Sequence, residues 1–173
     1  MISPKVGWEY IDDSGHSTDE MLRGLLFPLL GILAVACFVP MLYNSATNTL
    51  TSCLVVAVIH FSKYVLTYFV TSYLLSGFYP VFSKSNIALT RLNGFVVYNI
   101  AFLVVLDMVN MVINADFTPL RFLVLWVVWL CAKGTEMLGF AQEKRVKFVA
   151  VASAMIIGLP FVFQKVMEMV IAK

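Results

Sequence analysis

The stretch AVIHFSKYVLTYF, residues 57–69, places an imidazole and an ammonium one helical turn apart inside an otherwise apolar run. These groups belong to His60 and Lys63. A charged side chain near the centre of a bilayer costs about 2.5–3.5 kcal/mol on insertion scales, so an intramembrane lysine is expected to have a partner. Asp107, in the next apolar segment, is the candidate partner, and Asn110 follows it by one helical turn.

Helix geometry predicts that these side chains can meet. At 1.5 Å per residue, a helix that starts near residue 50 places His60 about 15 Å and Lys63 about 20 Å below its outer end. An antiparallel helix ending near residue 113 places Asp107 about 10 Å below the same surface. The Lys63 stem leans toward the start of its own helix and so toward Asp107. We therefore predict a His60/Lys63/Asp107 cluster between the two helices, with Asn110 on its outer side.

Two interpretations of this cluster are open. In the first, an ion pair between Lys63 and Asp107 holds two helices together. In the second, the cluster is a proton relay or an ion site, because an imidazole can titrate near neutral pH and a buried amine can lose its proton. The sequence favours the structural ion pair, since a relay needs further carboxylates along a path and no other acid lies in the middle of an apolar segment.

The composition predicts an all-α integral membrane protein. Hydrophobic residues make up 61% of the chain and charged residues 13%, with a mean hydropathy of +0.89. Because a crossing needs roughly 20 apolar residues, 173 residues suffice for about five or six crossings and for no separate soluble domain. The net charge of +2 is too small for a nucleic-acid-binding protein, so we expect no nucleic-acid partner.

The chain divides into a polar tail, residues 1–17, and a transmembrane domain, residues 18–173. The tail is expected to form a short interfacial amphipathic helix that places Trp8 in the headgroup layer. Ser17 and Glu20 have capping-box spacing and predict the start of the first membrane helix. Five transmembrane helices are expected, at about residues 18–43, 50–75, 92–113, 120–138 and 147–170.

The distribution of basic residues predicts the orientation. Eight of the twelve Lys and Arg residues lie in or next to the amino-terminal tail and the loops after the second and fourth predicted helices, and three lie on the other side. The positive-inside rule places those segments in the cytoplasm, and an odd number of crossings then places the carboxyl terminus outside. The tail lacks the basic start of a cleavable signal peptide, so the first apolar segment is expected to remain as a helix.

A second group of charged residues lies in the segment WLCAKGTEMLGFAQEKRVKF, residues 129–148. Lys133 and Glu136 are three residues apart and are expected to pair along a helix surface. The following residues form a charged cytoplasmic corner that could bind a protein or anionic lipid, or could be an ordinary positive-inside loop. The candidate interaction residues are Trp8, Lys133, Glu136, Glu143, Lys144, Arg145 and Lys147.

Templates for catalysis and for cofactors find little to match. The sequence has no G-x-S-x-G, no H-E-x-x-H and no glycine-rich phosphate loop. Its three cysteines lie in apolar runs without C-x-x-C spacing, so we expect small apolar fillers and neither a metal site nor a disulfide framework. We expect no catalytic residues, no cofactor and no metal.

Motifs near both ends of the chain resemble a known family. The run GTEMLGFAQEKRVKFVAVASAMIIGLP, residues 134–160, follows an aromatic helix with Trp126 and Trp129 and looks like the closing helices of bacterial Yip-domain (Ypt-interacting protein) membrane proteins. The tail segment SPKVGWEYI, residues 3–11, resembles the same family's entry. The resemblance implies a five-helix bundle in the bacterial cytoplasmic membrane, with a cytoplasmic amino terminus and no catalytic residues.

These observations predict a membrane protein that works by interaction, through its tail and the loop at residues 139–147. Its expected partners are the lipid bilayer, a membrane or cytoplasmic protein, and a second copy of the chain. The alternative is a small transporter or channel, proton-linked through His60, Lys63 and Asp107.

Overall fold

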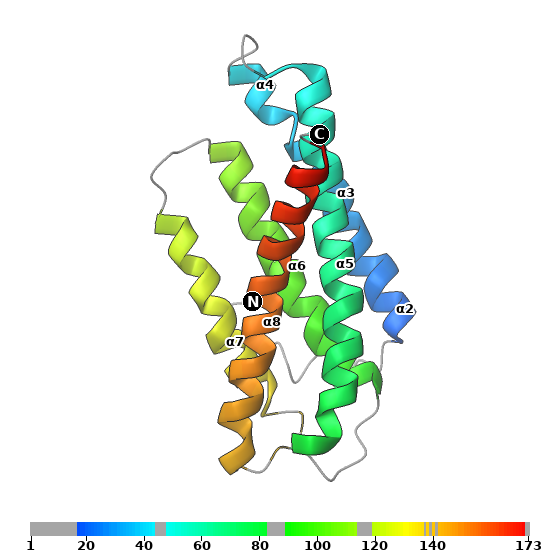
Figure 1. Ribbon diagram of the computed structural model, residues 1–173, viewed down its shortest axis with the longest axis vertical. Helices are drawn as coiled ribbons and strands as arrows, with labels where there is room; N and C mark the ends of the chain where they lie inside the picture. The colour runs from blue at the N-terminus through cyan, green and yellow to red at the C-terminus, as the bar shows by residue number, and fades with distance from the viewer. Residues whose placement is uncertain are drawn as a thin grey trace.

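The computed structural model describes residues 17–43, 48–82, 89–113, 119–136, 138, 140 and 142–171. Within these ranges the chain forms helices and turns and no strand (Figure 1). Four helices are long and apolar enough to cross a membrane, and a shorter apolar helix covers Phe122–Gly134. The predicted all-α class is therefore confirmed. The interfacial helix predicted within residues 1–17, and Trp8 with it, lies outside the described residues.

The first long apolar segment, Thr18–Tyr43, is interrupted twice. It contains α2 (Thr18–Met21), a π-helical turn η1 (Leu22–Leu26), α3 (Phe27–Ala36) and α4 (Val39–Tyr43). The expected capping box is present, because Glu20 N donates to Ser17 Oγ at 3.2 Å and Ser17 N donates to Glu20 Oε2 at 2.9 Å. The interruptions come just before Pro28 and Pro40, which cannot donate a backbone hydrogen bond and whose rings crowd the preceding turn.

The helix α5 (Leu50–Phe82) carries two members of the predicted cluster. Thr49 Oγ1 accepts a hydrogen bond from Ser52 N at 3.2 Å and so marks its start. The predicted end near residue 75 is wrong, because the helix continues through Pro80. Tertiary contacts outweigh the local helix-breaking signal: Leu75 is fully buried, and the Tyr79 hydroxyl donates to the Leu138 carbonyl at 3.2 Å.

The helix α6 (Leu89–Ile113) lies in the interior of the bundle and starts slightly earlier than predicted. Its buried residues cover much of its length. Gly94 permits a close approach to α2, because a Cβ atom at this position would lie 3.1 Å from Met21 Sδ. Asn99 is also buried, and its side-chain amide donates to the Phe95 carbonyl at 2.7 Å, which satisfies one polar group inside the bundle.

The last two segments differ from the prediction at their boundaries. The helix expected at about 120–138 is a 3₁₀ segment, η2 (Pro119–Leu125), followed by α7 (Trp126–Gly134). The last helix, α8 (Gln142–Ile171), starts at Gln142, where we expected a loop up to about residue 147. Charged residues end the apolar stretch but are good helix formers, so they extend the helix beyond the membrane-spanning part.

Successive segments alternate in direction along the bundle (Figure 1). Helix α5 packs against α3, α6 and α8, and α7 packs against α6 and α8. Helices α5 and α8 are distant in sequence but lie side by side over much of their length (Figure 1). Three helices, α5, α6 and α8, can therefore contribute side chains to one buried site.

Aromatic side chains fill one end of the bundle. The rings of Phe140 and Phe148 have centroids 4.3 Å apart, and those of Phe95 and Phe148 are 6.2 Å apart. Phe140 also contacts Tyr79 of α5, at a centroid distance of 5.2 Å. Because Phe148 is fully buried between these partners, it connects the start of α8 to α6 and to the turn after α7.

The outer surface of the bundle is strongly apolar. Large hydrophobic side chains that are more than 65% exposed occur on α3, α5 and α8 and include Val35, Tyr73, Phe161, Met169 and Val170. A soluble protein rarely exposes apolar surface on this scale, whereas the hydrocarbon core of a bilayer accommodates it. The surface therefore agrees with the composition in identifying a membrane protein.

Candidate functional site

One oxygen of Asp107 collects three hydrogen bonds from α5. Its Oδ2 atom lies 2.7 Å from Lys63 Nζ, 2.8 Å from the Tyr64 hydroxyl and 3.1 Å from His60 Nδ1. His60 and Lys63 are only 8% and 4% exposed. The predicted cluster of His60, Lys63 and Asp107 is therefore confirmed, and the ion pair between Lys63 and Asp107 is direct. A carboxylate with several donors is well stabilised in an apolar interior.

The other side of Asp107 is more open. The Asp107 side chain is 26% exposed, and no described residue hydrogen-bonds its Oδ1 atom. Asn110, which we expected beside the cluster, lies further along α6 and is partly buried. No described member of the cluster hydrogen-bonds Asn110, and the described partners of the Asp107 carboxylate all lie on α5.

Tyr64 is a member of the cluster that the sequence analysis did not identify. Its hydroxyl donates to Asp107 Oδ2 and also lies 3.3 Å from the Leu103 carbonyl. The Lys63 ammonium lies 4.9 Å from the centroid of the Tyr64 ring, within the range of a cation–π interaction. The signal was present in the sequence, because Tyr64 follows His60 by four residues and shares its helix face.

The cluster extends to α8 through a second hydrogen-bond acceptor of the Lys63 ammonium. Lys63 Nζ donates to Gln164 Oε1 at 3.1 Å, and Gln164 Nε2 donates to Glu168 Oε1 at 2.9 Å. Glu168 Oε2 accepts a further hydrogen bond from Lys165 Nζ at 2.7 Å. The Glu168 side chain is 38% exposed near the end of α8, so polar groups connect the buried ammonium to the protein surface.

A polar face of α5 continues away from the cluster. Thr67 and Thr71 follow Lys63 at intervals of four residues, and both are fully buried. Thr67 Oγ1 donates to the Lys63 carbonyl at 2.6 Å. The hydroxyl oxygen of Thr71 is buried without a hydrogen-bond partner among the described residues. A buried hydroxyl without a hydrogen-bond partner costs free energy. The hydroxyls of Thr67 and Thr71 therefore make this face of α5 unusually polar for the inside of a membrane bundle.

Arg145 ties the start of α8 to the end of α7. Its Nη2 atom donates to the Ala132 carbonyl at 2.6 Å and to Glu136 Oε1 at 2.7 Å, and its Nε atom donates to Thr135 Oγ1 at 3.1 Å. The predicted pair of Lys133 and Glu136 is confirmed at 3.1 Å. The hydrogen bonds from Arg145 and Lys133 lower the pKa of Glu136 below its usual value, so the carboxylate stays charged at neutral pH.

The other predicted interaction residues lie around these hydrogen bonds of Arg145. Lys144 and Lys147 are exposed at the start of α8, and Val146 between them is 74% exposed. The side chain of Glu143 lies outside the described part of the chain. We name the group Lys133, Glu136, Lys144, Arg145, Val146 and Lys147 the α7–α8 corner.

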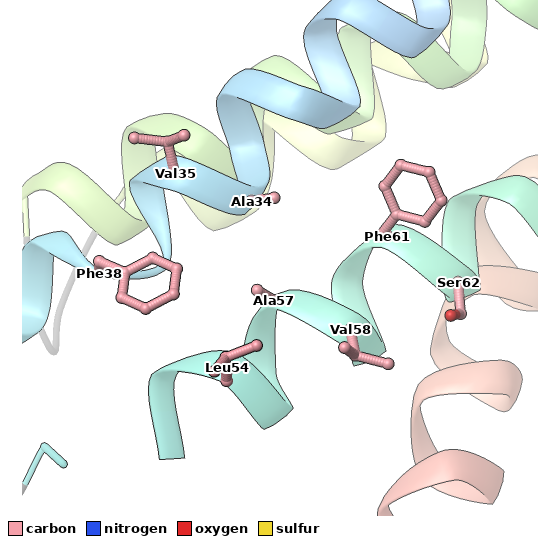
Figure 2. A pocket seen from close by; sticks show the side chains of 8 residues that line it. All are labelled: Ala34, Val35, Phe38, Leu54, Ala57, Val58, Phe61 and Ser62. Carbon is pink, nitrogen blue, oxygen red and sulfur yellow. The ribbon is translucent and has the colours of Figure 1, made fainter. Parts of the chain in front are cut away.

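An apolar groove separates α3 from the first half of α5 (Figure 2). Its volume is about 350 Å³, and Ser62 supplies the one polar side chain of its lining. Figure 2 shows side chains of the two helices facing each other across it, with small residues on both sides. The lining consists of Ala34, Val35, Phe38, Leu54, Ala57, Val58, Phe61 and Ser62. Such a lining suits hydrocarbon and offers little to a polar ligand.

The chemistry of the described residues does not indicate a metal centre. Across the ranges given above, no group of three or more His, Cys, Asp or Glu side chains is placed to hold a metal ion. The three cysteines are free and buried, as expected of small apolar fillers. The intramembrane polar cluster is therefore the arrangement whose chemistry most clearly indicates a function, because it can hold a charge or a proton.

No family model, curated protein or solved structure matches this chain. Its function is therefore inferred from its own side chains and from the motifs in its sequence.

Proposed function

We propose that this chain is a five-helix, Yip-like protein of the bacterial cytoplasmic membrane that acts by binding a protein partner and carries out no catalysis. In this proposal η2 and α7 together supply the fourth crossing. The alternating directions of the segments (Figure 1) support an odd number of crossings. The positive-inside rule then supports a cytoplasmic amino terminus, an external carboxyl terminus and a cytoplasmic α7–α8 corner.

The observation that carries this proposal is the set of hydrogen bonds that Arg145 donates to the end of α7. These three hydrogen bonds fix the start of α8 against the end of α7, so the exposed side chains of the corner have defined positions. A preorganised surface loses less conformational entropy on binding than a flexible loop does. Lys147 and Val146 together offer a cation beside an apolar contact, which suits an acidic and partly apolar segment of a partner.

The proposal predicts that Lys144→Gln/Lys147→Gln reduces partner capture by roughly tenfold or more, because each cation near an anionic surface contributes about 1 kcal/mol. The measurement is a quantitative pull-down of the tagged protein from solubilised membranes, with the co-purified proteins compared by mass spectrometry. Lys165→Gln is the control, since it removes an exposed cation from the opposite end of α8. Equal recovery of the same partners with the double variant would exclude the corner as the binding surface.

Proton-linked transport is the second candidate function. The specific observation in its favour is the polar chain from Asp107 through Lys63 and Gln164 to Glu168, which reaches the exposed end of α8. The buried hydroxyls of Thr67 and Thr71 extend the polar face of α5 in the other direction. A transporter needs such groups on both sides of a central titratable site.

If the chain transports protons, liposomes containing it will show a proton flux that depends on pH between about 5 and 8 and that His60→Ala abolishes. A pH-sensitive dye enclosed in the liposomes measures the flux. Lys147→Gln, which removes an exposed cation outside this polar chain, serves as the control and should retain the flux. The absence of flux above that of protein-free liposomes, or a flux that His60→Ala leaves intact, would rule out this candidate.

A further inference from the structure

The two ring nitrogens of His60 have different surroundings. Nδ1 lies 3.1 Å from Asp107 Oδ2, and because an ionised carboxylate only accepts hydrogen bonds, Nδ1 carries the proton of the neutral ring. The lone pair is then on Nε2. No described residue hydrogen-bonds Nε2. Nε2 is therefore a proton acceptor without a described partner, in a side chain that is only 10% exposed.

We propose that Nε2 of His60 is a proton-binding site within the membrane bundle. In the binding step a hydronium ion transfers its proton to Nε2, one O–H bond breaks, one N–H bond forms, and water leaves. The net charge of His60, Lys63 and Asp107 changes from zero to +1. This inference goes beyond partner binding at the α7–α8 corner, and it does not require net transport, because a site can bind a proton without moving it across the membrane.

The charges around His60 act on this step in opposite directions. Asp107 on α6 stabilises the imidazolium, whereas the Lys63 ammonium, bound to the same carboxylate oxygen, opposes it. Protonation also makes two cations compete for Asp107 Oδ2, so Lys63 is expected to depend more on Gln164 of α8. Among the described residues, the remaining titratable or charged groups near the cluster are Tyr64 and Cys53 on α5, Cys37 at the end of α3, and Glu168 and Lys165 on α8.

Solid-state NMR of the full-length protein in liposomes tests the site directly. The chain has two histidines, so His16→Gln with ¹⁵N-labelled histidine leaves the signals of His60 alone. At about pH 8 the spectrum should show a neutral ring protonated on Nδ1, and at about pH 5 an imidazolium with both nitrogens protonated. A ring protonated on Nε2 at pH 8, or one that stays neutral at pH 5, would overturn the proposal.

Two substitutions separate proton binding from a role in packing alone. At about pH 6, Asp107→Asn should lower the ratio of imidazolium to imidazole by about tenfold or more, and Lys63→Gln should raise it by a similar factor. If Asp107→Asn does not fold, Lys63→Gln still tests the inference, because Asp107 keeps its partners His60 and Tyr64. An unchanged or lowered ratio in Lys63→Gln would contradict it. Proton binding without liposome flux would reject the transport function and leave this site in place.

Discussion

Asp107→Asn is expected to reduce the free energy of unfolding by about 3–5 kcal/mol, the range found when one partner of a buried ion pair is removed. The reason is the 5% side-chain exposure of Lys63, whose ammonium would keep only neutral partners. The amide that replaces the carboxylate can also donate toward Lys63 or His60, which adds an unfavourable contact between donors. Two of the three helices at the cluster would lose their charged contact at once.

Reversible unfolding in mixed detergent micelles measures this effect. Glu168→Gln is the matched control, because it makes the same carboxylate-to-amide change at the exposed end of the polar chain and should leave stability nearly unchanged. The double variant Lys63→Met/Asp107→Leu should recover most of the lost stability, since an apolar pair has no buried charge to leave unpaired. If Asp107→Asn unfolds like Glu168→Gln, the ion pair does not support the bundle.

Phe148→Ala is expected to cost about 3–5 kcal/mol, as large-to-small substitutions at fully buried aromatic positions do. Phe148 is fully buried and contacts the rings of both Phe140 and Phe95. Its removal leaves a cavity at the point where α8 joins α6 and the turn after α7. Rigid helices on either side limit how far that cavity can close.

The same micelle unfolding measurement, with Phe161→Ala as the control, checks this prediction. Phe161 is on the same helix but is 68% exposed, so its truncation removes contacts with detergent or lipid and few with protein. The expected result is a large loss for Phe148→Ala and a small one for Phe161→Ala. Similar losses for the two variants would mean that the aromatic end of the bundle is not tightly packed.

The contact between Lys63 and Asp107 could be predicted because both ingredients are visible in a sequence. Charges inside apolar runs demand a partner, and the rise of a helix fixes the depth of each charge. Tyr64 follows His60 by four residues and could have been included on that ground, whereas Gln164 could not be assigned in either way. Neutral polar side chains are tolerated in membrane helices without a specific partner, so their presence does not indicate which neighbour they contact.

The boundaries of the helices were less predictable than the contacts between charged side chains. The sequence predicts too early an end for α5, because Gly77 and Pro80 indicate a loop locally, while the burial of Leu75 and Tyr79 keeps the chain helical. The sequence predicts a charged loop around Arg145, whereas in the structure Arg145 donates hydrogen bonds to the Ala132 carbonyl and to side chains at the end of α7. That contact depends on how the chain turns between the two helices, which periodicity does not encode.

The length of α5 has a consequence for the membrane around the protein. Its 33 residues span about 50 Å, whereas the hydrocarbon core of a typical bilayer is about 30 Å thick. Figure 1 shows the first turns of α5, together with α4, extending past the end of α8. Lipids beside these turns must stretch, or the helix must tilt. Hydrophobic mismatch therefore couples the protein to the thickness of its host bilayer.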